Sequence, residues 1–176
     1  MSMNDWKKDE EFLLYVTDLL EREEVKKLEE ITQHYHSTRL EHSISVSYHS
    51  FCIARKFKLD KRAIARAGLL HDLFYYDWRT TKFDEGTHAY MHPRIACANA
   101  EKLTVLSDLE KDIIIKHMWG ATMALPKYKE SFVVTMVDKY CACHEAMAPT
   151  LVKSKKNFRS KWASIKSSIL ANSITF

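Results

Sequence analysis

Residues 67–76 read Ala-Gly-Leu-Leu-His-Asp-Leu-Phe-Tyr-Tyr, which places His71 and Asp72 inside an apolar run. A buried carboxylate costs several kcal/mol unless it is paired with an opposite charge or binds a metal. The pair therefore predicts polar partners elsewhere in the chain. Four further residues lie in or at the end of partly apolar segments with helical spacing, and they are the candidates: His42, His92, His117 and Asp138. Six nitrogen and oxygen ligands of this kind suit one or two first-row transition metals.

Length and composition favour one domain built of helices. The chain has 176 residues, of which 46% are hydrophobic, enough for one sizeable core. It has only three glycines and three prolines, too few for many strands joined by tight turns, so we expect an all-α fold. No apolar run approaches the ~18 residues needed to span a bilayer, and the polar N-terminus contains no signal-peptide core. We therefore expect a cytoplasmic protein.

The cysteines do not follow a metal-binding pattern. They are Cys52, Cys97, Cys141 and Cys143, and none has Cys-x-x-Cys spacing. Cys141 and Cys143 would point to different sides of a helix, which argues against a zinc knuckle. We expect all four to be reduced thiols in the core of a cytosolic protein.

Helix-start signals recur along the chain. They are two pairs with capping-box spacing, Thr38/Glu41 and Ser107/Glu110, the N-cap residue Asp60, and Pro93, which suits a first helical turn. Together with the spacing of apolar residues, these signals predict helices over residues 5–31, 39–57, 60–76, 93–103, 108–118, 129–147 and 155–171.

Helical spacing places the candidate ligands on buried faces. His71 follows Ile64 and Ala67 at three- and four-residue steps, so it lies on the core side of its helix. Asp138 follows residues 132–137, which are apolar almost all round, as in a buried helix.

Each candidate also has a simpler explanation. A single histidine on an apolar face is more often a hydrogen-bonded core residue than a ligand. Asp138 could pair with Lys139, and Asp72 could accept a hydrogen bond from a buried tyrosine. The combination of four histidines and two aspartates at such positions favours a metal site. The other histidines (His34, His36, His49, His88 and His144) are expected at the surface or behind the ligands, with His88 the exception that we retain as a substrate contact.

The order His42…His71-Asp72…His92…His117…Asp138 resembles the HD superfamily of metal-dependent phosphohydrolases over about residues 36–148. The local motifs match as well: Arg39-Leu-Glu-His42-Ser-x-x-Val46, Gly68-Leu-Leu-His-Asp72, His92-Pro93 followed by Ile95-Ala96, Ile115-Lys-His117-Met-Trp, and Val137-Asp138-Lys. His92 and His117 resemble the additional pair of the two-metal branch. That branch includes HD-GYP-type cyclic dinucleotide phosphodiesterases and small bacterial enzymes that split diadenosine tetraphosphate.

The resemblance implies a ligand set and a reaction. His42, His71, Asp72 and Asp138 would hold one metal, and Asp72, His92 and His117 the other, with Asp72 as the bridge. Metals about 3.5–4 Å apart can hold a hydroxide that attacks phosphorus. Nitrogen-rich ligation favours transition metals over magnesium. We expect iron or manganese, with zinc, cobalt or nickel as alternatives. Besides Asp72, the expected catalytic residues are Arg39 and Lys139, which would contact phosphate unless they form surface salt bridges.

The chain departs from the resembled pattern at Tyr75. Many two-metal relatives carry a lysine four residues after the HD histidine, whereas this chain has Tyr75 within the run Phe74-Tyr75-Tyr76-Asp77-Trp78. The GYP signature is absent, so cyclic dinucleotide cleavage of that type is less expected. We expect Phe74 in the core. Tyr75 could stack on a substrate base or belong to the core.

The C-terminal segment differs from the rest of the chain. We divide the protein into an HD domain, residues 1–149, and a basic C-terminal helix or tail, residues 150–176. The tail holds six of the 27 Lys and Arg residues and no Asp or Glu, so it accounts for the net charge of +4. Phe158, Trp162, Ile165 and Ile169 have the spacing of an amphipathic helix. Such a helix could bind membranes, nucleic acid or proteins. We favour docking on the acidic N-terminal segment or on a second subunit, so a homodimer is possible and nucleic acid is not expected.

Three functional classes are compatible with the sequence. The favoured one is a metal-dependent phosphohydrolase or phosphodiesterase that hydrolyses a nucleotide or related phosphoester with a metal-bound hydroxide. The alternatives are a di-iron oxygenase on an HD scaffold and a metal-containing binding module without turnover. The sequence names neither the substrate nor the metal.

Overall fold

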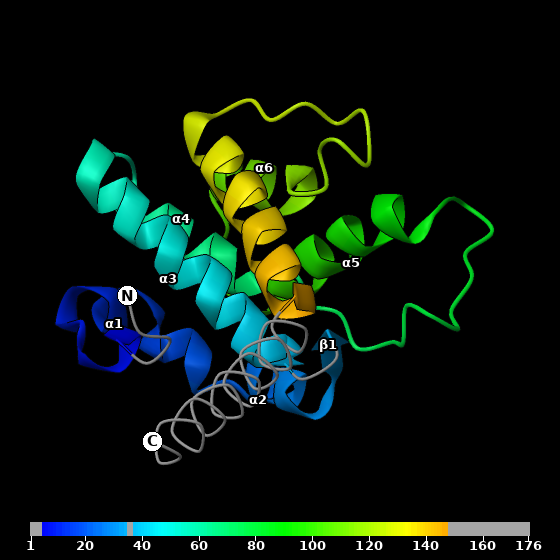
Figure 1. Ribbon diagram of the computed structural model, residues 1–176, viewed down its shortest axis with the longest axis horizontal. Coiled ribbons are helices and arrows are strands. Elements are labelled where there is room, and N and C mark those ends of the chain that lie inside the picture. The colour runs from blue at the N-terminus through cyan, green and yellow to red at the C-terminus, as the bar shows by residue number, and fades with distance from the viewer. Residues whose placement is uncertain (1–4, 35–36, 148–176) are drawn as a thin grey trace, which may run out of the picture.

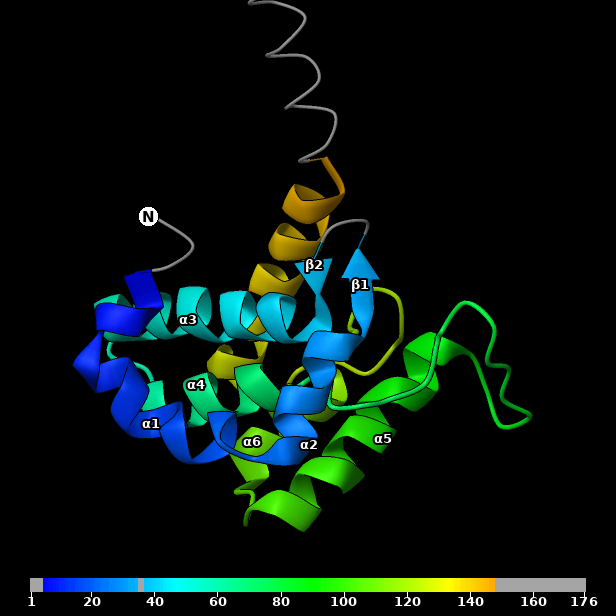
Figure 2. The same ribbon diagram turned by 90° about the horizontal axis from the view of Figure 1, so that it is seen from below.

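Helix α4 (Lys61–Leu70) lies at the centre of the fold and is buried on all sides from Ala63 to Leu70. In this computed structural model, which describes residues 5–34 and 37–147, α4 packs against α1, α3, α5 and α6 (Figures 1 and 2). Small residues allow this close packing. Ser47 of α3 donates a hydrogen bond from Oγ to the Ala65 carbonyl at 2.6 Å, and Gly68 faces the Ser47 backbone.

The surrounding elements are mostly helical, as predicted. They are η1 (Asp5–Lys8), α1 (Glu10–Leu20), α2 (Glu23–Lys26), η2 (Lys27–Glu30), β1 (Thr32–His34), β2 (Ser37–Thr38), α3 (Arg39–Phe57), α5 (His88–Leu103), α6 (Asp108–Lys116) and a final helix over residues 129–147. The strands β1 and β2 pair antiparallel and form the single small sheet of the described residues. The all-α fold class is therefore confirmed.

The predicted helix caps are present. Thr38 and Ser107 form capping boxes with Glu41 and Glu110, because each hydroxyl accepts from the backbone N–H of its glutamate and each carboxylate accepts from the backbone N–H of its cap residue. The Asp60 carboxylate accepts from the Ala63 N–H at 2.9 Å and starts α4. These caps set the first residues of α3, α4 and α6.

The predicted helix over residues 5–31 is wrong, because the structure divides this segment into η1, α1, α2 and η2. Asp9 caps α1 through the Phe12 N–H, and Arg22 adopts an extended conformation after α1. The break turns the chain so that Phe12 of α1 and both Val25 and Leu28 of the following turns reach the same core. Burial of apolar side chains outweighs helix continuity here.

Two other predicted helices have different bounds. The helix over residues 60–76 ends at Leu70, where tight turns carry the chain onward through backbone bonds from Leu73 to Leu70 and from Phe74 to Asp72. The helix expected from Pro93 begins at His88, because the Thr87 carbonyl accepts from the next turn. Pro93 therefore lies inside α5 rather than in its first turn.

The cysteine prediction is partly wrong. All four described cysteines are free thiols, and Cys97 and Cys141 are buried. Cys143 is exposed, because it lies on the outer face of helix 129–147, two positions after the buried Cys141. The predicted helix over residues 155–171 lies outside the described residues. None of the described helices is long and apolar enough to cross a membrane.

Gly68→Ala should destabilise the fold. An added Cβ would lie 3.0 Å from the Ser47 Cα, a backbone atom that cannot rotate away. We expect the free energy of unfolding to fall by about 1–3 kcal/mol despite the better helix propensity of alanine. Thermal and urea unfolding would measure the change, with the exposed helical substitution Ala98→Ser as a control expected within about 0.5 kcal/mol of the parent. An unchanged stability would show that α3 and α4 can separate at little cost.

Candidate metal centre

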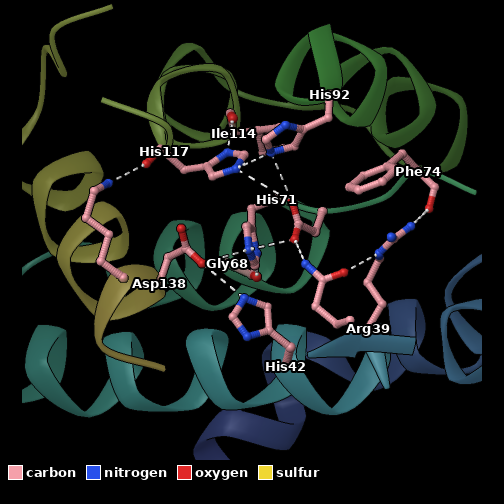
Figure 3. Close-up of polar contacts among 12 residues, drawn as sticks. Arg39, His42, Gly68, His71, Phe74, His92, Ile114, His117 and Asp138 are labelled. Carbon is pink, nitrogen blue, oxygen red and sulfur yellow. Dashed lines mark hydrogen bonds and ion pairs between the residues drawn. The ribbon is translucent and has the colours of Figure 1, made fainter. Parts of the chain in front are cut away.

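The six predicted ligands converge on one buried centre from five parts of the chain. Figure 3 shows the four histidines and Asp138 around this centre. His42 lies in α3, His71 and Asp72 directly follow α4, and His92 lies in α5. His117 caps the C-terminus of α6, and Asp138 lies in helix 129–147. None of the six is more than 9% exposed. The sequence pattern therefore identified side chains that the fold brings together.

Local backbone geometry orients three of the imidazoles. In each, Nδ1 lies 2.7–2.9 Å from a carbonyl of the preceding helical turn, which can only accept a hydrogen bond. Nδ1 must therefore carry a proton, and in the neutral ring Nε2 is then a free electron-pair donor that points into the centre. The pairs are His71 with Gly68, His92 with His88, and His117 with Ile114.

His42 is oriented by a carboxylate instead. Its Nδ1 lies 3.0 Å from Glu145 Oε1, and its Nε2 lies 3.0 Å from Asp138 Oδ1. The Glu145 carboxylate also accepts a hydrogen bond from the Ser37 hydroxyl at 2.7 Å. A carboxylate behind a histidine is a common outer partner of metal ligands, because it fixes the ring and strengthens the donor nitrogen.

Two electron-pair donors face each other on one side of the centre. The Nε2 atoms of His92 and His117 are 2.8 Å apart, and neither carries a proton when both rings are neutral and both Nδ1 atoms donate to carbonyls. Asp72 Oδ1 lies 3.3 Å from the first nitrogen and 3.6 Å from the second. This arrangement is repulsive unless a proton or a metal cation lies between the three atoms. Ligand atoms at about 2.0–2.1 Å from one metal are themselves about 3 Å apart, which these distances match.

On the other side of the centre, a histidine nitrogen and carboxylate oxygens also lie close together. The Nε2 atom of His71 lies 3.6 Å from Asp138 Oδ1 and 3.7 Å from Asp72 Oδ2, and it has no hydrogen-bond partner among residues 5–34 and 37–147. Two groups of side chains have spacing that could hold an ion: His42 with His71 and Asp138, and His71 with Asp72 and His117. The groups meet at His71, and the Asp72 carboxylate turns one oxygen toward each side. The donor set thus fits one or two divalent cations.

The charges of the site favour cations. Burial opposes ionisation of Asp72, but His71, His92 and His117 outweigh it and hold the pKa of this carboxyl well below its usual range. The pKa of Asp138 is lowered in the same way by His42 and His71. Both carboxylates are therefore ionised at neutral pH although they are largely buried. Such buried anions are stable only beside positive charge.

Without a metal, protons on the histidines supply part of that charge. Burial opposes protonation of His42, yet hydrogen bonds to Asp138 and Glu145 raise its pKa to about 10. Burial and the neighbouring His92 and His71 instead lower the pKa of His117 to about 3. The proton on His42 Nε2 thus takes the place of a cation, whereas His117 stays neutral and ready to coordinate.

A cavity of about 260 Å³ opens onto the centre. His42, Asp72, His92, His117 and Asp138 form its base, and the wall also includes Gln33, Trp78, His88, Met118, Lys139 and Ala142. The His88 ring stacks on His92 with centroids 4.4 Å apart, and the Trp78 ring stacks on His88 at 5.7 Å. His88 and Lys139, both expected at the site, therefore line the cavity, and the two stacked rings form an aromatic wall.

Two other residues that we expected to contact the substrate, Arg39 and Tyr75, do not line the cavity. Arg39 is fully buried, with NH1 donating to the Phe74 carbonyl at 2.6 Å and Nε donating to Gln33 Oε1 at 2.7 Å. It lies behind the centre, because its long side chain runs into the core rather than into the cavity. Tyr75 is 42% exposed and donates its hydroxyl to the Glu24 carbonyl in α2. Phe74 is buried, as predicted.

Sequence reasoning missed three residues at the site: Gln33, Trp78 and Glu145. Trp78 belongs to the aromatic run of residues 74–78, in which the sequence suggests only Tyr75 as a substrate contact, and the loop after α4 returns Trp78 to His88. Gln33 and Glu145 carry no local signal, because each reaches its partner across a large separation in sequence.

Comparison with known families identifies the chain. The HD domain family model matches residues 39–143, well over half of the chain. The protein therefore belongs to the HD domain family, whose members are mostly metal-dependent phosphohydrolases. Comparisons with curated proteins and with solved structures gave no match.

The centre should bind up to two transition-metal ions per chain. His117→Ala removes a ligand from the side of the centre formed with His92 and Asp72, so one ion should be lost while the other is retained. Metal analysis of anaerobically purified protein and calorimetric titration with Mn²⁺ would count the ions. His144→Ala, which removes an exposed histidine, is the matched control and should bind as the parent does. Equal loss of both ions in His117→Ala would contradict two separable sites.

Proposed function

We propose that this protein is a metal-dependent phosphohydrolase or phosphodiesterase that hydrolyses a nucleotide or a related phosphoester. The observation that carries the proposal is the convergence of four histidines and two ionised carboxylates, of which all but His71 line a cavity of about 260 Å³. Two divalent cations bound there, iron or manganese by preference, would activate water and neutralise phosphate oxygens.

The positions of the side chains support the proposed ligand roles. His42, His71, Asp72 and Asp138 are proposed to hold one ion, and Asp72, His92 and His117 the second. Asp72 serves both because its two oxygens face opposite sides of the centre. The backbone and Glu145 hold the imidazoles in place, so little reorganisation is needed when ions or substrate bind.

Lys139 is the proposed phosphate contact from this chain. It lines the cavity, and its Nζ lies 3.3 Å from the carbonyl of His117. Burial lowers the pKa of Lys139, and the Asp138 carboxylate beside it acts in the opposite direction. An ammonium group here would meet a phosphate oxygen held over the centre. The catalytic role expected for Arg39 is better assigned to Lys139, because Arg39 does not reach the cavity.

The aromatic wall supports a nucleotidic substrate. The Trp78 ring is 38% exposed and lines the cavity two rings away from the ligand His92. Arg79 adds a cation beside it, with Cζ 4.9 Å from the Trp78 ring centre and NH2 donating to the Gln33 carbonyl at 3.2 Å. A planar base and an anionic phosphate would find both an aromatic surface and a cation at this rim.

The reaction class can be tested without oxygen. A hydrolase needs only a Lewis-acidic ion and water, so the Mn²⁺-loaded protein should release phosphate or a nucleoside monophosphate from a nucleotidic phosphoester under strict anaerobiosis. Asp72→Asn keeps the shape of the side chain but removes the shared negative charge, and turnover should fall by about 10³-fold or more while the helical circular dichroism signal persists. The substrate screen would measure phosphate and nucleotide release.

Other outcomes would assign a different class. Oxygen consumption coupled to turnover of a compound without a phosphoester, and no cleavage in the anaerobic assay, would support a di-iron oxygenase. Tight binding of a nucleotide without any product would support a binding module. Near-parental turnover by Asp72→Asn would remove Asp72 from the reaction.

Lys139→Met should reduce kcat/KM for a phosphoester by about 10- to 100-fold, because a charge-assisted hydrogen bond contributes about 1.5–3 kcal/mol. The loss should appear mainly in KM if Lys139 binds ground state and transition state equally. Lys127→Met removes an exposed cation outside the cavity and should leave both constants unchanged. Equal constants for Lys139→Met and the parent would exclude a phosphate contact.

A further inference from the structure

The Asp72 carboxylate is held from outside the centre by one neutral side chain. Gln33 Nε2 donates to Asp72 Oδ2 at 2.8 Å, and Gln33 is only 8% exposed. The other oxygen, Oδ1, has no hydrogen-bond donor among residues 5–34 and 37–147 and faces His92 and His117. One hydrogen bond therefore fixes the rotation of this carboxylate.

Arg39 determines which end of the Gln33 amide faces Asp72. The Arg39 Nε–H donates to Gln33 Oε1 at 2.7 Å. A guanidinium has donors only, so the amide oxygen must face Arg39 and the amide NH₂ must face Asp72. The flipped amide would place a carbonyl oxygen against the carboxylate and two donors against each other.

The core in turn holds the Arg39 side chain. NH1 donates to the Phe74 carbonyl at 2.6 Å, and Cζ lies 3.6 Å from the Phe74 ring centre (Figure 3). The Arg39 N–H also donates to the Ile31 carbonyl at 2.8 Å, which ties the first residue of α3 to the chain just before β1. Backbone and side chain are thus both fixed, and the pairing of β1 with β2 brings Gln33 opposite Asp72.

The chain of contacts also joins two buried charges. Arg39 is fully buried, and burial lowers its pKa while the Asp72 carboxylate raises it. The positive Arg39 guanidinium and the negative Asp72 carboxylate compensate each other's charge across the Gln33 amide. Both charges polarise this amide in the same direction. Hydrogen bonds in such a chain strengthen one another.

We propose that Gln33, fixed by Arg39, is a positioning residue that orients the Asp72 carboxylate so that one oxygen faces each of two metal positions. This inference rests on the metal centre of the proposed function, not on its substrate. Neither residue is one of the six proposed metal ligands. Gln33 acts through Asp72, and Arg39 acts through Gln33.

Titration with Mn²⁺ tests the inference without any turnover. Gln33→Met keeps the length of the side chain and removes its hydrogen bonds. Loss of an outer partner typically costs 10- to 100-fold in metal affinity, so we expect the weaker of the two Mn²⁺ sites to lose about that much. The electron paramagnetic resonance signal of a carboxylate-bridged Mn²⁺ pair, present in the loaded parent, should be lost or replaced by isolated Mn²⁺ in the variant.

Arg39→Met tests the second step. If Arg39 acts through Gln33, the weaker-site affinity of Arg39→Met should fall similarly, and the double variant should lose no more than the larger single effect. Arg66→Met is the matched control, because Arg66 is a buried arginine that pairs with Asp18 at 2.6 Å outside the centre. It should lower stability without changing either Mn²⁺ affinity. Where Arg39→Met does not fold, Gln33→Met alone decides.

The outcomes separate this inference from the proposed function. Two Mn²⁺ ions bound by the parent, with unchanged affinities and an unchanged coupled signal in Gln33→Met, would overturn the positioning role and leave the metal centre intact. Reduced thermal stability with unchanged affinities would likewise assign Gln33 to packing alone. Fewer than two ions in the parent would overturn both. If the parent binds two ions but hydrolyses no phosphoester, a weaker second site in Gln33→Met would still support the positioning role while the proposed reaction is refuted.

Discussion

Two ionised aspartates buried among four histidines are the constraint on which the centre of this protein depends. Asp72 and Asp138 are at most 9% exposed and have lowered pKa values, so their charge must be balanced inside the fold. Protons on His42 and the distant guanidinium of Arg39 balance part of it. The Nε2 atoms of His92 and His117 lie 2.8 Å apart, so a cation bound between them would have two nitrogen donors. The histidines around Asp72 and Asp138 can thus be understood as the groups that balance these two buried negative charges, directly or through a bound cation.

The C-terminal ends of α4 and α6 place three of the ligands at the centre. Helix α4 is buried all round and ends at Leu70. His71 and Asp72 therefore lie just beyond its C-terminus, still buried, at the point where the other elements meet. His71 and His117 each follow the last residue of a helix, and each donates Nδ1–H to a carbonyl three residues earlier. Carbonyls at helix C-termini lack backbone partners. The same hydrogen bond that satisfies the helix end therefore directs Nε2 to the centre.

Much of this arrangement could be predicted from the sequence, because its signals are local. The apolar run around His71, the caps at Thr38 and Ser107, and the helical spacing of the ligands all act within a few residues. Features that depend on tertiary contacts could not be predicted from the sequence. The break after α1 depends on where Val25 and Leu28 find a core, and the buried position of Arg39 depends on Phe74, 35 residues away. Gln33 gave no signal, since an isolated glutamine is ordinary until the fold brings it to Asp72.

Helix 129–147 contributes a second residue, Glu145, to the centre besides its predicted ligand Asp138. Asp138 and Glu145 are seven residues apart, two helical turns, so they lie on one face of this helix. The first meets Nε2 of His42 and the second meets Nδ1, each at 3.0 Å, so the same imidazole is held from both nitrogens. The other three imidazoles take their orientation from their own helices. The orientation of His42 instead requires helix 129–147 to be docked on α3, so this ligand is in place only when that tertiary contact is made. An ion bound by both His42 and Asp138 would in turn stabilise the docked helix, because binding to the folded state alone shifts the folding equilibrium toward it.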